Sequence, residues 1–231
     1  MRKNFELTLY EDSAELVVGA TNEAMEVIVR HLAEKKVFHI ALTGGPLGTE
    51  FAQKLVEIIN SAGDLTGLNI WFSDERFDTT DSPLRNSRPV KDGLDNSTVT
   101  VHEVKSSDGG VSVFEAAESY EAQLRGLQMD ICVLGLGFDG HVASLFPMHW
   151  NPLAADTAIA IVDSPKPPPE RVSFSMAFIN SSDQVWIIAS GKIKAAAAKA
   201  VLEADASVPA GHVQAAGITR LFLDSEAFSN G

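Results

Sequence analysis

Short apolar segments alternate with amphipathic segments along most of the chain. The apolar segments carry hydrophobic side chains at nearly every position, which is typical of strands buried on both faces of a sheet. This pattern predicts one strand within the first dozen residues. It predicts further strands at 37–42, 68–72, 99–104, 131–134, 158–162, 172–176, 185–189 and 220–223.

The amphipathic segments predict helices between these strands. The first begins at Asp12-Ser13 and places Leu16, Ala20 and Ala24 on one face. Further helices are expected at 49–60, 113–127, 142–146 and 192–204. The alternation predicts an α/β fold, with a mostly parallel sheet flanked by helices on both faces. Because no clear linker or repeat interrupts it, residues 1–231 are expected to form a single domain.

Three of the predicted strands lead into loops of unusual composition, at 43–48, 73–88 and 135–147. Ligands of parallel α/β sheets bind outside the carboxyl ends of the strands. We therefore expect these three loops to form one shared site.

Charge and composition narrow the functional classes. The formal net charge is −13, with 18 Lys and Arg against 31 Asp and Glu, which disfavours nucleic acid and anionic membranes as partners. A single cysteine, Cys132, excludes an internal disulfide. No apolar run approaches the roughly 18 residues of a membrane span. The first six residues lack the apolar core of a signal peptide, so a cytoplasmic protein is expected.

The first two loops offer groups that bind anions. In the loop at 43–48, Gly44 and Gly45 let backbone N–H groups approach an anion at the start of a helix, although a simple tight turn would use the same glycines. No Walker-type Gly-Lys-Ser/Thr follows. The second loop carries Asp74 and Arg76, and the Arg76 guanidinium suits a carboxylate or a phosphate. A solvated charge cluster is the alternative interpretation of this loop.

The third loop contains the candidate for proton transfer. His141 follows a strand and a glycine-rich turn, and histidine takes and returns protons near neutral pH. A lone histidine is more often structural than catalytic. We apply that interpretation to the five others, His31, His39, His102, His149 and His212.

Residues 135–147, GLGFDGHVASLFP, resemble the signature Gly-x-Gly-x-Asp-Gly-His-x-Ala-Ser-Leu-Phe-Pro of the 6-phosphogluconolactonases. Other marks of that family follow the same order along the chain: Asp74-Glu75-Arg76, Arg85-Asn86, residues 164–172, residues 191–195 and Phe222-Leu223-Asp224. The resemblance extends from about residue 41 to residue 224. It implies a Rossmann-like α/β fold and hydrolysis of 6-phospho-D-glucono-1,5-lactone to 6-phosphogluconate, in the oxidative pentose phosphate pathway.

The resemblance also implies roles for single residues. His141 is expected to be the general base, with Asp139 orienting its ring and backbone N–H groups of the loop and of the following helix holding the oxyanion. The remaining candidates bind substrate. Lys194, Arg76, Gly44 and Gly45 are expected at the phosphate, Lys166 and Arg171 are further cations or structural ion-pair partners, and Asn86 and Asp74 are expected at sugar hydroxyls.

No cofactor or metal is expected, because no cysteine or histidine cluster has metal-ligand spacing. The expected partner is a small sugar-phosphate lactone, and the chain is expected to be a monomer.

The chain departs from the family pattern at one point. Many members carry Gly-Gly-Ser-Thr-Pro in the first loop, where hydroxyls help to hold phosphate, whereas this chain has Gly45-Pro46-Leu47-Gly48 with hydroxyls only at Thr43 and Thr49. We interpret this as phosphate held by backbone groups.

Two other functions remain as alternatives. A sugar-phosphate isomerase or deaminase of the same fold would carry a glutamate where Phe146 stands. A non-catalytic sugar-phosphate sensor would carry a basic DNA-binding segment.

Overall fold

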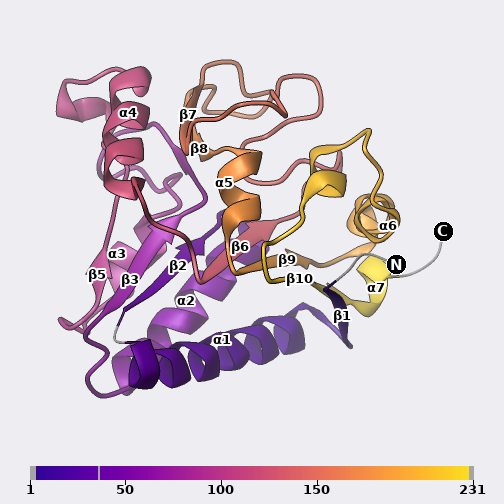
Figure 1. Ribbon diagram of the computed structural model, residues 1–231, viewed down its shortest axis with the longest axis horizontal. Coiled ribbons are helices and arrows are strands. Elements are labelled where there is room, and N and C mark those ends of the chain that lie inside the picture. Colours follow the sequence, from indigo (N-terminus) through magenta and orange to yellow (C-terminus); the bar gives the residue numbers. More distant parts are fainter. Residues whose placement is uncertain (1–3, 36, 229–231) are drawn as a thin grey trace.

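The computed structural model describes residues 4–35 and 37–228, in which seven parallel strands form a central sheet (Figure 1). The strand order is β1-β10-β9-β6-β2-β3-β5. The strands are β1 (Phe5–Tyr10), β2 (Phe38–Leu42), β3 (Leu68–Phe72), β5 (Thr100–Val101), β6 (Ile131–Gly135), β9 (Gln184–Ala189) and β10 (Ile218–Asp224). The prediction of a mostly parallel α/β sheet is confirmed.

A smaller antiparallel sheet lies beside the central one. Its order is β4 (Asp74–Arg76), β8 (Arg171–Phe174) and β7 (Ala158–Ile161), with Asp74 opposite Ser173 and Arg76 opposite Arg171. Strand β4 lies within residues 73–88, for which the sequence pattern predicts a loop. The strand is only three residues long and strongly charged, and its pairing with β8 depends on a partner almost 100 residues away in the sequence.

Helices cover both faces of the central sheet (Figure 1). Alternate strand residues point to opposite faces, so Ile40 and Leu42 pack in one core whereas Ala41 packs in the other. The first core receives α1 (Ser13–Lys35) and α2 (Gly45–Ser61), with α3 (Arg88–Gly93) against α2. The second receives α4 (Val113–Leu124), α5 (Met176–Ser181) and α6 (Ala195–Glu203), and α7 (Ser225–Phe228) packs on β10 and α6.

Two of the predicted helices differ most from the structure. Helix α2 begins at Gly45, four residues before the predicted start at Thr49, because Pro46 is well accommodated in a first helical turn, where its missing N–H is not needed. The helix expected at 142–146 is wrong. There Val142 pairs with Leu136 and with Leu145 in isolated bridges, and Ala143 has a left-handed φ of 50°, which a continuing right-handed helix excludes.

The order of the strands places the candidate loops together. From β2 the chain continues outward to β3 and β5, whereas β6, on the other side of β2, leads to β9 and β10. The two directions separate between β2 and β6, which is where open parallel sheets bind ligands. No helix among the described residues is long and apolar enough to cross a bilayer.

Candidate active site

A cavity of about 480 Å³ lies at the carboxyl ends of β2, β6 and β9. The structure brings eight of the ten predicted site residues to its wall: Gly44, Gly45, Asp74, Arg76, His141, Lys166, Arg171 and Lys194. The other two, Asn86 and Asp139, lie one layer behind, each hydrogen-bonded to a residue of the wall. The three loops predicted to form one shared site therefore line the same cavity.

The loop after β6 fixes the imidazole of His141. Its Nδ1 is hydrogen-bonded to Asp139 Oδ1, which leaves Nε2 as the ring nitrogen available to a ligand. The side chain of His141 is only 13% exposed. A Cβ atom at Gly137 would lie 1.9 Å from Nδ1, so this ring position requires glycine there.

The surroundings of His141 favour its neutral form. Burial lowers the pKa of the imidazole below its usual 6.5, and Lys166 lowers it further, whereas the hydrogen bond and the charge of Asp139 oppose both. The Phe146 ring lies 4.6 Å from the imidazole, centroid to centroid, and contributes to the burial. Burial raises the pKa of Asp139, but its contacts with His141 outweigh this, so its pKa is lowered and it stays ionised. A neutral imidazole beside a carboxylate is the arrangement of a general base.

Two lysines approach the cavity from different segments. Lys194 follows the turn after β9, and its Nζ donates to the Leu136 carbonyl at 2.7 Å. Lys166 comes from the proline-rich segment before β8, and its Nζ lies 5.2 Å from the centre of the Phe138 ring. Burial lowers the pKa of both lysines. The charges of Arg171 and Arg76 lower the pKa of Lys166 further. The charge of Lys166 in turn lowers the pKa of Lys194. The cations around the cavity therefore repel one another, and a bound anion would relieve this repulsion.

Two arginines come from the small antiparallel sheet. Arg171 lies 3.9 Å from Asp74 and donates to the carbonyls of Lys166 and Pro168, so it also anchors the proline-rich segment. Arg76 donates to the Leu84 carbonyl, and its buried Nε has no partner among the described residues. Because Arg76 lines the cavity, its guanidinium group is placed to bind an anionic ligand.

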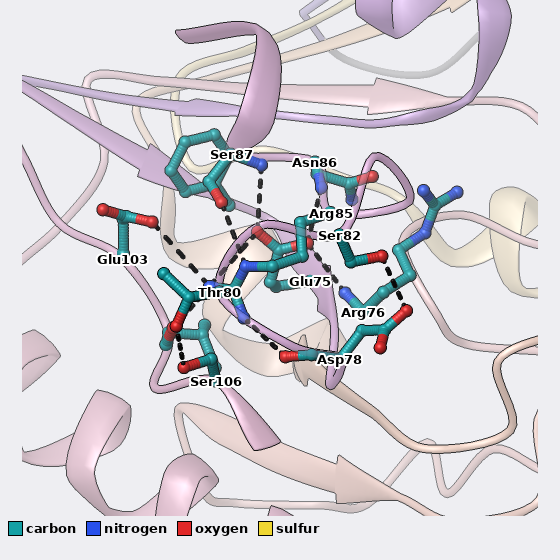
Figure 2. Close-up of polar contacts among 12 residues, drawn as sticks. Glu75, Arg76, Asp78, Thr80, Ser82, Arg85, Asn86, Ser87, Glu103 and Ser106 are labelled. Carbon is teal, nitrogen blue, oxygen red and sulfur yellow. Dashed lines mark hydrogen bonds and ion pairs between the residues drawn. The ribbon is translucent and has the colours of Figure 1, made fainter. Parts of the chain in front are cut away.

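A buried polar network supports this wall from behind (Figure 2). The fully buried carboxylate of Glu75 accepts hydrogen bonds from the backbone N–H groups of Arg76, Asn86 and Ser87 and lies 3.8 Å from Arg85 Nη2. Burial raises the pKa of Glu75, and the charge of Arg85 and the hydrogen bonds from Ser87 and Asn86 oppose the increase. The network therefore fixes the backbone from which Arg76 and Asn86 extend.

Asp74 is oriented from two sides. Asn86 donates to Asp74 Oδ1 at 3.0 Å, and Ser144 Oγ donates to Oδ2 at 2.7 Å. Asn86 is buried and does not line the cavity, and its side-chain amide donates to Asp74.

Three residues that support the site, Ser144, Glu75 and Arg85, are not among the predicted site residues. Side chains alternate along a strand, so Glu75 points away from Asp74 and Arg76, but this signal applies only once residues 74–76 are known to form a strand.

Comparison with known proteins agrees with this geometry. The family model described as glucosamine-6-phosphate isomerases/6-phosphogluconolactonase matches residues 11–222. A "Probable 6-phosphogluconolactonase 2" of Oryza sativa subsp. indica is 33% identical, over 99% of this chain and 91% of the relative. The 6-phosphogluconolactonase of Streptomyces coelicolor is 32% identical, over 97% of this chain and 94% of the relative.

Solved structures show the same fold. The 6-phosphogluconolactonase from Thermotoga maritima has a TM-score of 0.84 at 26% identity and is matched over 96% of this chain and all of that chain. A monomeric glucosamine-6-phosphate deaminase also matches, with a TM-score of 0.77 at 18% identity over 96% of this chain and 98% of that chain. The deaminase shows that the fold alone does not select one chemistry. Residues 135–147, which resemble the lactonase signature, lie at the cavity, and the near full-length relatives are 6-phosphogluconolactonases. Together with the family match, they show that the chain belongs to the glucosamine-6-phosphate isomerase/6-phosphogluconolactonase family and, within it, to the lactonases.

Proposed function

We propose that this chain is an enzyme that hydrolyses 6-phospho-D-glucono-1,5-lactone to 6-phosphogluconate, the lactonase step of the oxidative pentose phosphate pathway. The observation that supports it most is a buried imidazole, paired with a carboxylate, in a cavity that four cationic side chains also line. The imidazole provides the base for ester hydrolysis. The cations provide the attraction for an anionic substrate that a chain of net charge −13 would otherwise repel.

The phosphate is proposed to bind at the start of α2. Among the described residues no side chain caps this helix, and its first turn has no acidic residue, so its free N–H groups and partial positive charge face the cavity. Lys194 and Arg76 supply the opposite charges. Gly44 must be glycine, because a Cβ atom there would lie 1.8 Å from Asn86 Oδ1. Asp74 accepts hydrogen bonds from sugar hydroxyls, in the orientation set by Asn86.

In the proposed reaction, His141 Nε2 removes a proton from a water molecule whose oxygen forms a bond to C1 of the lactone. The electron pair of the C1 carbonyl moves to its oxygen. When this electron pair forms the C1 carbonyl again, the bond between C1 and the ring oxygen breaks, and the imidazolium gives its proton to the ring oxygen. Asp139 stabilises the imidazolium between the two steps. Residues 142–146 form no helix, so no helix N-terminus at these residues can donate hydrogen bonds to the oxyanion.

A sugar-phosphate deaminase is the second candidate because it shares the fold. Phe146 is 2% exposed and lies against His141, at the position where the deaminase pattern has a glutamate. A phenyl ring transfers no proton, so the site has no second acid–base group there. A non-catalytic sensor is disfavoured by the acidic charge of the chain.

The test is a direct assay of the purified chain with enzymatically generated 6-phospho-D-glucono-1,5-lactone. Product is followed through a coupled 6-phosphogluconate dehydrogenase, and spontaneous hydrolysis is subtracted. We expect enzyme-dependent turnover of the lactone and no ammonia release from glucosamine 6-phosphate. Ammonia release without lactone turnover would establish the deaminase instead.

The pH dependence of this activity has a predictable sign. A base must be unprotonated, so kcat/KM falls as the pH falls through the pKa of His141, which burial holds below 6.5. Asp139 raises that pKa, so Asp139→Asn is expected to shift the acidic limb to lower pH while reducing the plateau, because the ring loses its ionised partner. A pH series of kcat/KM measures both effects. A shift of the limb to higher pH would contradict the assignment.

The organisation of the protein around this activity is also proposed. The chain acts as a single domain and a monomer in the cytoplasm, on a small sugar-phosphate lactone, without a nucleic-acid partner and without a metal or other cofactor. The net charge of −13 supports the absence of a nucleic-acid partner, and the proposed steps use only side chains of the chain.

A further inference from the structure

A single carboxylate joins the segments that follow β9 and β10. Asp224 is the last residue of β10 and is 4% exposed. Its Oδ2 accepts from the Ser190 hydroxyl at 2.6 Å, and both of its oxygens accept from the N–H of Gly191 at 3.0 Å. Its Oδ1 also accepts from the N–H of Ala227, in α7, at 2.7 Å. Asp224 therefore fixes the turn after β9 against β10 and α7.

The surroundings of Asp224 keep its carboxyl group ionised. Burial raises its pKa, but the hydrogen bonds from Ser190, Ala227 and Gly191 outweigh the burial, so the pKa lies below its usual 3.8. An ionised carboxylate accepts hydrogen bonds and donates none, and two oxygens are needed to serve three donors that approach from different segments. The residue type is therefore matched to the task of holding this turn.

The turn that Asp224 fixes carries Lys194 to the cavity. Gly191 has a φ of 89° and a ψ of 149°, a conformation almost restricted to glycine, and its carbonyl accepts from the N–H of Lys194 at 2.9 Å. Ser190 and Lys194 line the cavity, whereas Asp224 lies behind them. From this turn Lys194 Nζ reaches the Leu136 carbonyl at 2.7 Å. A shift of Gly191 would therefore move the lysine.

We propose that Asp224 is a positioning residue, which holds Lys194 where its ammonium group binds the phosphate of the substrate. The inference rests on the proposed function, because it concerns the placement of one cation of that site. A lysine ammonium is a point charge on a flexible stem, so a fixed backbone restricts where it can lie. The charges that affect the pKa of Lys194 are those of Lys166 and Asp139, so we assign to Asp224 an effect through the backbone of the turn.

Asp224→Asn tests this role with little change in shape. The amide keeps one acceptor oxygen and places an NH₂ group against donors, so the turn is expected to shift. A hydrogen bond to a charged group corresponds to about 10-fold in affinity, which limits the effect of misplacing Lys194. We expect KM for the phosphorylated lactone to rise several-fold, towards that limit, with kcat little changed. For unphosphorylated gluconolactone, kcat/KM is expected to stay near the parental value.

A double variant distinguishes positioning from a general structural role. In Lys194→Met no ammonium group remains to be positioned, so adding Asp224→Asn is expected to raise KM for the phosphorylated lactone no further. Gly191→Ala strains the turn but leaves the carboxylate in place, and it is expected to reproduce the selective loss. Asp64→Asn is the matched control. Asp64 also accepts from a hydroxyl and a backbone N–H, both of Thr66, but it precedes β3 and does not line the cavity, so both substrates are expected to be unaffected.

Two measurements keep this test separate from the test of the lactonase activity. Calorimetric binding of 6-phosphogluconate, but not of gluconate, is expected to weaken in Asp224→Asn even if the parental chain turns over no lactone. A crystal structure of Asp224→Asn is expected to show the turn displaced and the contact between Lys194 Nζ and the Leu136 carbonyl lost. If thermal unfolding shows that Asp224→Asn does not fold, Gly191→Ala is used in the same measurements.

Three outcomes would overturn the proposal. The first is equal weakening of 6-phosphogluconate and gluconate binding. The second is a further rise in KM when Asp224→Asn is added to Lys194→Met. The third is a crystal structure of the variant in which Lys194 keeps its parental position.

Discussion

His141→Ala is expected to lose most of its lactonase turnover while it still binds substrate. General base catalysis by a positioned side chain contributes about 10²–10⁴-fold to a rate, so kcat is expected to fall by a factor in that range. The cations and the α2 N-terminus that hold the phosphate are unchanged, so KM is expected to stay within a few-fold of the parental value. Initial rates over a range of lactone concentrations, corrected for spontaneous hydrolysis, measure both constants.

The chain offers a matched histidine for this experiment. His102 is also partly buried, and it stacks on Trp71 with 3.7 Å between ring centroids, but it does not line the cavity. His102→Gln is therefore expected to retain kcat. If His141→Ala kept near-parental turnover, the imidazole would have no part in the reaction, and the pH limb assigned to it would belong to another group.

Much of this site could be predicted from sequence because its chemistry is concentrated in strand-terminal loops. The apolar strands indicated a parallel sheet, and a parallel sheet brings carboxyl-terminal loops together whatever their separation in the sequence. That reasoning placed Gly44, Asp74 and His141 in one cavity, which the structure confirms. It required no knowledge of side-chain conformations.

The parts that could not be predicted depend on contacts between distant segments. The helix expected at 142–146 has suitable residues, but Val142 instead pairs with Leu136, and helical propensity is too weak to resist such tertiary pairing. Strand β4 exists because β8 lies beside it, and Glu75 is buried because Arg85 returns to meet it. Neither partner can be identified from a single sequence by periodicity alone.

Arg85→Met is expected to produce the largest loss of stability among the changes considered. The side chains of Arg85 and Glu75 are 2% and 0% exposed, so removal of the arginine leaves a buried carboxylate without its counter-charge (Figure 2). Breaking one partner of a buried pair typically costs about 3–5 kcal/mol. Urea unfolding followed by far-ultraviolet circular dichroism measures the change. Arg88→Met, which removes a partly exposed arginine paired with Asp81 and Asp92, is expected to change stability little.

The loss should depend on pH with a definite sign. Burial raises the folded-state pKa of Glu75 above 4.5, so its protonated form contributes stability at low pH that is lost as the pH rises through the folded-state pKa. Arg85 opposes that increase in pKa. Without it the folded-state pKa is higher still, and the difference in unfolding free energy between parent and variant is expected to grow from pH 4 to pH 8. A difference independent of pH would mean that lost packing, rather than the unpaired charge, destabilises the variant.

A second substitution separates the charge from the hydrogen bonds. Glu75→Gln retains a carbonyl oxygen that can accept from the N–H groups of Arg76 and Asn86 but carries no charge. In the Arg85→Met background it is therefore expected to recover part of the stability at pH 8 and little at pH 4. Because these N–H groups belong to the backbone that presents Arg76 and orients Asp74 through Asn86, kcat/KM at pH 8 should recover with it. Stability without activity in the double variant would show that the carboxylate itself is needed to shape the cavity wall.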